Sequence, residues 1–158
     1  MKKLILTTVA IFTGLIFVSA QEIADNAIGL RIGDDDGFGT EISYQRALGD
    51  NNRLEANLGW RSGDGFDGFK LTGVYQWVWE LDGNFNWYAG AGGGVGSYSF
   101  DNDAVDDDTF FFIAGDIGIE YNFDIPLLIS LDFRPELGFG DFRDDLNFDI
   151  ALGVRYQF

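Results

Sequence analysis

The last thirteen residues alternate between large apolar side chains and small or polar ones. The large apolar residues are Leu146, Phe148, Ile150, Leu152, Val154, Tyr156 and Phe158. A period of two is that of a β-strand with one apolar and one polar face. The segment exceeds the usual strand of about five or six residues, and a tilted strand needs only roughly 9–11 residues to cross a bilayer. We therefore predict a membrane-spanning strand.

The same alternation recurs in seven earlier segments, at 27–33, 40–48, 53–62, 69–79, 85–100, 110–121 and 127–139. Short turns at 49–52, 82–84 and 124–126 alternate with longer acidic connections at 34–39, 63–68, 101–109 and 140–145. Outer-membrane barrels have this alternation of short turns and longer loops. The sequence therefore predicts an all-β fold, an eight-stranded antiparallel up-and-down transmembrane β-barrel over residues 21–158.

Residues 1–20 have the pattern of a cleaved signal peptide. Lys2 and Lys3 precede a largely apolar stretch, and Val18-Ser19-Ala20 suits cleavage before Gln21. The stretch is short for a transmembrane helix, which needs about 20 residues. Removing this segment takes the net charge from −16 to −18, an acidity that argues against nucleic acid as a partner. The chain also has no Cys and no His.

Periodicity alone does not tell which face is outside. A soluble lipocalin-like barrel would turn the apolar face inward, around a ligand. An eight-stranded barrel, however, is just wide enough for side chains to fill, and it cannot enclose four Trp and many Leu, Ile and Phe residues. The other face is small and polar, with many glycines. We therefore expect the apolar face to contact lipid, with Arg46 as its single charge.

The polar face carries six cations and seven carboxylates. Buried charges must be paired, so we expect an internal ion-pair network that plugs the lumen. Its predicted members are Arg31, Glu41, Arg53, Glu55, Arg61, Lys70, Asp116, Glu120, Asp132, Arg134, Glu136, Asp149 and Arg155.

The C-terminal pattern Gly153-x-x-Tyr156-x-Phe158 resembles the terminal strand by which outer-membrane barrels are recognised for assembly. With the signal peptide and the strand count, it makes the chain similar to the small eight-stranded barrels of the OmpA transmembrane-domain and OmpX-like group. The resemblance implies the outer membrane of a Gram-negative-type bacterium. It also implies membrane lipid and the barrel-assembly machinery as partners.

The four longer connections carry thirteen carboxylates and one cation, Arg143. Oxygen clusters of this kind suit hard cations. One hypothesis is therefore weak Ca²⁺ or Mg²⁺ binding at Asp101, Asp103, Asp106, Asp107 and Asp108, which could bridge the rim to lipopolysaccharide. The alternative is a solvated, repulsive rim. We predict no other cofactor.

Catalysis is not expected, because the serines lack a His base. Two functions remain open: a structural or interaction protein with a plugged lumen, and a narrow channel or transporter for small solutes.

Overall fold

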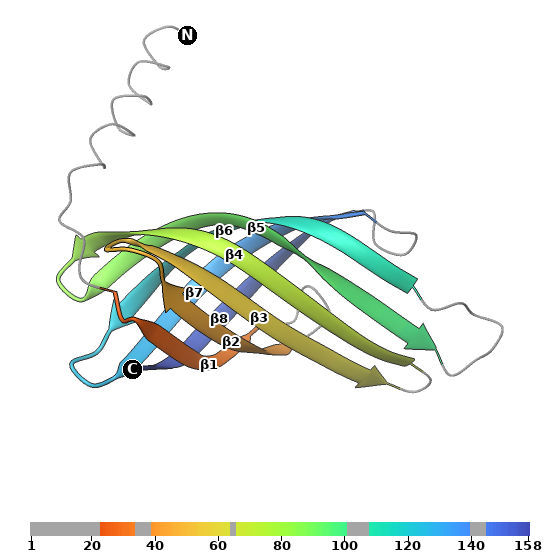
Figure 1. Ribbon diagram of the computed structural model, residues 1–158, viewed down its shortest axis with the longest axis horizontal. Coiled ribbons are helices and arrows are strands. Elements are labelled where there is room, and N and C mark those ends of the chain that lie inside the picture. Colours follow the sequence, from red (N-terminus) through yellow and green to blue (C-terminus); the bar gives the residue numbers. More distant parts are fainter. Residues whose placement is uncertain (1–22, 34–38, 64–65, 101–107, 140–144) are drawn as a thin grey trace, which may run out of the picture.

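The computed structural model describes residues 23–33, 39–63, 66–100, 108–139 and 145–158, and these form a closed antiparallel barrel of eight strands (Figure 1). Each strand pairs with the next, and β8 pairs with β1 to close the sheet. The strands are β1 (Asn26–Ile32), β2 (Thr40–Ala47), β3 (Asn52–Gly63), β4 (Phe66–Asp82), β5 (Phe85–Phe100), β6 (Asp108–Asn122), β7 (Leu127–Phe139) and β8 (Leu146–Gln157). No helix within the described ranges is long and apolar enough to cross a membrane.

The predicted strands and their order are confirmed, and the bounds of β5 and β7 agree with the prediction. The predicted connection 63–68 is wrong, because Gly63 already pairs with Phe66 across a hairpin. Glycines and acidic residues make this segment look like a loop. The ladder between β3 and β4 nevertheless runs into it, because Gly63 pairs with Phe66, and Asp67 and Gly68 also have cross-strand partners. The predicted signal peptide, residues 1–20, lies outside the described residues.

The two ends of the barrel differ in their connections. The turn end holds the hairpins after β2, β4 and β6, and the loop end holds the other connections (Figure 1). At the turn end, Gly83 has a φ of 54° in the two-residue turn between Asp82 and Phe85. Glycine accepts this left-handed conformation without steric cost. The seam between β1 and β8 also closes there, where Asn26 and Phe158 exchange backbone hydrogen bonds of 3.1 and 2.9 Å.

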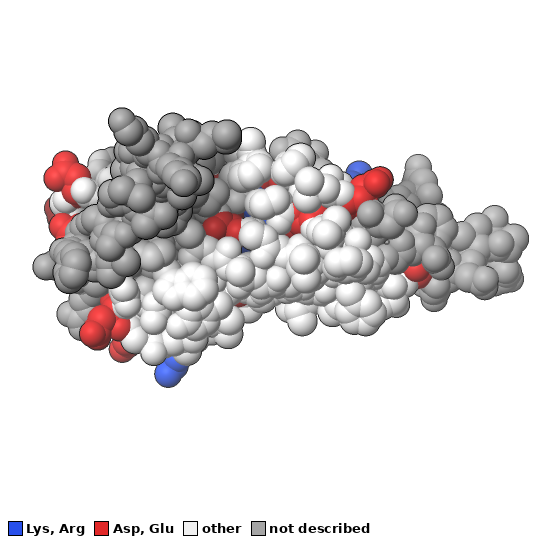
Figure 2. Space-filling model, turned by 90° about the horizontal axis from the view of Figure 1, so that it is seen from above, with Lys and Arg blue, Asp and Glu red and all other residues white. Residues whose placement is uncertain are grey.

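The outer surface is apolar between the two ends. Large side chains such as Ile113, Leu131 and Ile150 are each at least half exposed, and the flank in Figure 2 is largely white. Arg46 is exposed on this face at the turn end, where its Nη1 donates to Asn26 Oδ1 over 3.1 Å. A surface this apolar is stable in contact with acyl chains rather than water, so the fold is that of a transmembrane barrel.

Candidate functional site in the barrel interior

The polar face of the strands turns inward, and most of the predicted charged residues lie there. Twelve of the thirteen are at most 5% exposed: Arg31, Glu41, Arg53, Glu55, Lys70, Asp116, Glu120, Asp132, Arg134, Glu136, Asp149 and Arg155. They come from all strands except β5, which contributes glycines instead. Ions buried this deeply are stable only with partners. Their pairing therefore determines whether the lumen is closed or open to solutes.

Arg61 is the exception, because it is exposed near the end of β3. Its membership of the internal ion-pair network therefore stays a prediction. Its position in the alternation points it inward, but β2 pairs with β3 only as far as Gly59. Among the described residues, only β4 pairs with β3 beyond that point.

The group nearest the loop end centres on the Arg31 guanidinium. Its Nη1 lies 3.1 Å from Glu41 Oε2 and 2.6 Å from Asp149 Oδ2, and its Nε donates to Asp132 Oδ1 over 3.0 Å. Beside it, Lys70 Nζ lies 2.7 Å from Glu136 Oε1 and 3.9 Å from Glu41 Oε1. The contacts join β1, β2, β4, β7 and β8 across the lumen.

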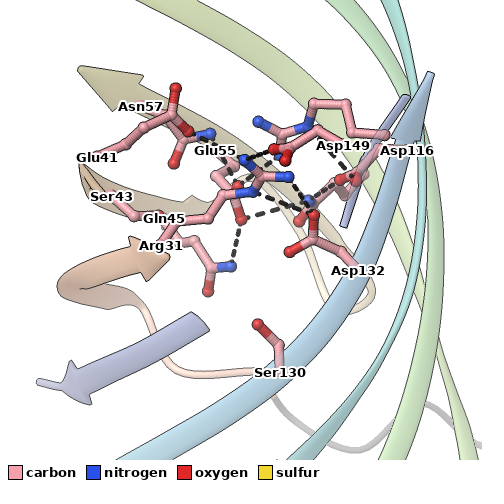
Figure 3. Close-up of polar contacts among 12 residues, drawn as sticks. Arg31, Glu41, Ser43, Gln45, Glu55, Asn57, Asp116, Ser130, Asp132 and Asp149 are labelled. Carbon is pink, nitrogen blue, oxygen red and sulfur yellow. Dashed lines mark hydrogen bonds and ion pairs between the residues drawn. The ribbon is translucent and has the colours of Figure 1, made fainter. Parts of the chain in front are cut away.

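The middle group centres on Glu55. Its two oxygens accept hydrogen bonds from Arg134 Nη2 at 2.9 Å and Arg155 Nη2 at 3.1 Å. Gln45 and Asn57 also donate to it (Figure 3). Gln76 is a further donor. Arg155 further donates to Ser43 Oγ and Ser130 Oγ at 2.9 and 2.8 Å. Asp116 joins through Gln76, whose Nε2 donates to it over 2.5 Å, and through Arg134 Nε at 3.6 Å.

The group at the turn end is a fork of Arg53 on Glu120. Arg53 Nη2 lies 2.7 Å from Glu120 Oε2, and its Nη1 lies 3.2 Å from Oε1. Paired hydrogen bonds of this geometry are the strong form of an arginine–carboxylate contact. The guanidinium also stacks over the Tyr88 ring, 4.8 Å from its centre.

Aromatic side chains inside the lumen were not predicted, because the inner face was expected to be small and polar. Tyr88, Phe110 and Phe112 are buried there. The glycines of β5 make room for the two phenylalanines, since a Cβ on Gly94 or Gly96 would collide with their rings. The signal that could have revealed this is an aromatic residue on one strand beside a glycine on its neighbour.

The predicted assembly residues lie on β8 and at its end. Gly153 faces the lumen, and a Cβ there would collide with Ser130 Oγ and the Arg155 guanidinium. Tyr156 and Phe158 are more than half exposed on the outer face. Gly153 thus has a packing role of its own, while the two rings are available at the seam.

The predicted cation site falls mostly outside the described residues, since Asp101, Asp103, Asp106 and Asp107 lie there. Asp108 begins β6, and its backbone oxygen accepts a 3.0 Å hydrogen bond from Ser97 Oγ. Within the described ranges, no three acidic side chains are grouped as a ready metal site.

Solved barrels share this architecture. The neisserial surface protein A, NspA, has a TM-score of 0.59 at 15% identity, covering 85% of this chain and 94% of that one. Ail, the attachment invasion locus protein of Yersinia pestis, has a TM-score of 0.55 at 15% identity, covering 86% and 100%. A de novo designed transmembrane β-barrel scores 0.53 at 14% identity, covering 88% and 99%.

No protein-family model and no curated protein matches the chain. Identities this low establish the fold alone. The predicted class, an eight-stranded antiparallel transmembrane barrel, is confirmed, and the chain is similar in fold to small eight-stranded outer-membrane barrels.

Proposed function

We propose that the protein is a non-enzymatic outer-membrane barrel with a structural or interaction role, its lumen closed by ion pairs and its loop end facing the cell surface. Its fold is shared with a neisserial surface protein and with Ail of Yersinia pestis. The many large apolar side chains exposed on its flank suit the acyl layer of a bilayer.

The observation that supports a closed lumen is that charged side chains from opposite walls of the barrel contact each other. Glu55 on β3 accepts from Arg134 on β7, four strands away around the barrel. Arg53 on β3 reaches Glu120 on β6, and Lys70 on β4 reaches Glu136 on β7. In a water-filled channel such side chains would lie along the wall and be hydrated. Here their charged ends meet across the interior, where solutes would have to pass.

Conductance in a planar bilayer tests this proposal. We expect no unitary currents from the wild-type barrel. The double variant Arg134→Ser with Arg155→Ser should conduct intermittently, because it removes two large side chains from the middle group. Arg46→Ser is the matched control, since it removes a cation from the outer face, and it should remain silent. Reproducible unitary currents from the wild type would contradict the closed lumen and favour the narrow channel for small solutes.

The proposed partners are the lipids around the barrel, including lipopolysaccharide, and the barrel-assembly machinery. The acidic connections at the loop end would approach anionic lipopolysaccharide through divalent cations, which neutralise both surfaces. Tyr156 and Phe158, exposed beside the seam of the barrel, are the proposed assembly signal together with Gly153.

A further inference from the structure

The buried charges of the described residues do not balance. Five cations face seven carboxylates inside the barrel. Arg53 pairs with Glu120 at the turn end, and Arg134 and Arg155 contact Glu55 and Asp116 in the middle. The excess of negative charge therefore lies in the group nearest the loop end, around Arg31.

Within that group, one guanidinium contacts three carboxylates. Arg31 binds Asp132 through Oδ1, Asp149 through Oδ2 and Glu41 through Oε2. Asp132 is 2% exposed and Asp149 is 1% exposed. A single positive charge therefore offsets only part of the negative charge that it contacts.

The second observation is that two of these carboxylates each have one oxygen that Arg31 does not contact. Asp132 Oδ2 and Asp149 Oδ1 are buried and have no hydrogen-bond partner among the described residues. A buried acceptor without a partner is destabilising, more so when it is charged. Both side chains hold the same guanidinium from adjacent strands, and Asp149 pairs with Arg134, two residues from Asp132, so the two side chains lie in one region of the lumen.

We propose that this region binds a hard metal cation of the Mg²⁺ and Ca²⁺ class, with Asp132 Oδ2 and Asp149 Oδ1 as its protein ligands. Hard cations take oxygen ligands, and Mg²⁺ in particular is commonly held by one or two carboxylates while it keeps several waters. A largely hydrated ion needs few protein ligands, which agrees with finding, among the residues that the structure describes, no three acidic side chains placed to hold one metal ion. The ion would supply the missing positive charge.

Thermal unfolding of the refolded protein in detergent micelles tests the site. The protein is first stripped with chelator, then unfolded in Mg²⁺ or Ca²⁺, or in choline chloride at the same ionic strength. We expect a divalent ion to raise the unfolding midpoint by at least about 4 °C over choline. Asp132→Asn and Asp149→Asn should each abolish this gain, because each removes one ligand charge while its amide oxygen still accepts from Arg31.

A control separates this site from the acidic connection at 101–108. A variant with Asn at Asp101, Asp103, Asp106, Asp107 and Asp108 should keep the gain. No advantage of either divalent ion over choline would overturn the proposal, as would a gain that survives in both Asp132→Asn and Asp149→Asn.

Location is measured independently on the wild type with Mn²⁺, whose paramagnetism broadens nearby NMR signals. We expect broadening of the amides around Asp132 and Asp149 in β7 and β8. Broadening confined to the connections at the loop end would contradict the proposed site. This measurement decides the question even where an Asn variant fails to fold.

Discussion

Glu55 accepts hydrogen bonds from five side chains, which come from five different strands. It is fully buried, and two of its donors are arginines. The loss of such a residue destabilises a protein mainly because its former partners stay buried without it. Without the carboxylate, Arg134 and Arg155 would be buried cations with fewer partners.

Glu55→Ala should therefore destabilise the barrel by about 3–5 kcal/mol, the usual cost of removing one partner of a buried ion pair. The measurement is the free energy of unfolding in urea, with the protein in lipid vesicles. Asp50→Asn is the control, because Asp50 lies exposed in the turn after β2. It should change stability by less than about 0.5 kcal/mol. Equal effects of the two substitutions would contradict the role assigned to Glu55.

At the scale of elements, β5 has small residues on its inner face, and side chains from the neighbouring strands occupy the space that they leave in the lumen. Four inward positions are glycine, and the Phe110 and Phe112 rings from β6 pack over two of them, Gly94 and Gly96. Glycine in a strand normally weakens it. Here its small size allows close approach of side chains and backbone inside a narrow barrel.

Gly94→Ala should accordingly destabilise the barrel by about 1–3 kcal/mol, because the added methyl group collides with Leu71 O and the Phe112 ring. Gly73→Ala is matched to it, since Gly73 lies on adjacent β4 and a Cβ there meets nothing within 4 Å. Urea unfolding in vesicles should show no loss for Gly73→Ala. An equal loss of stability in both variants would contradict the role assigned to the glycines of β5.

The end of β8 gives a prediction about biogenesis rather than stability. Phe158→Ala should reduce the amount of assembled barrel in cells, because it removes an aromatic ring of the proposed assembly signal. Refolding in detergent should be unchanged, since that ring is 60% exposed. Phe148→Ala, on the same outer face of β8 and 51% exposed, should assemble normally. The comparison uses heat-modifiable gel migration of membrane fractions; equal assembly of both variants would remove the proposed signal.

Across the whole molecule, the alternation in the sequence predicted which residues face inward, but not which of them meet. Arg53 and Glu120 are far apart along the chain, and their contact depends on the tilt and stagger of the strands. A local pattern contains neither quantity. For the same reason the buried Phe110 and Phe112 were missed, since their space comes from glycines on β5. Alternation also does not tell which positions near a strand end are exposed, as Arg61 is.

The central claim is the orientation of the two faces, with aliphatic side chains against acyl chains and ion pairs inside. NMR of the barrel in lipid nanodiscs tests it most directly, through magnetisation transfer from acyl chains to protein methyl groups. We predict strong transfer to Ile113, Leu131 and Ile150, which are exposed on the outer face. The methyl groups of Val74 and Leu128, buried in the interior, should receive none. Transfer to Val74 and Leu128 but not to the three outer residues would contradict the account.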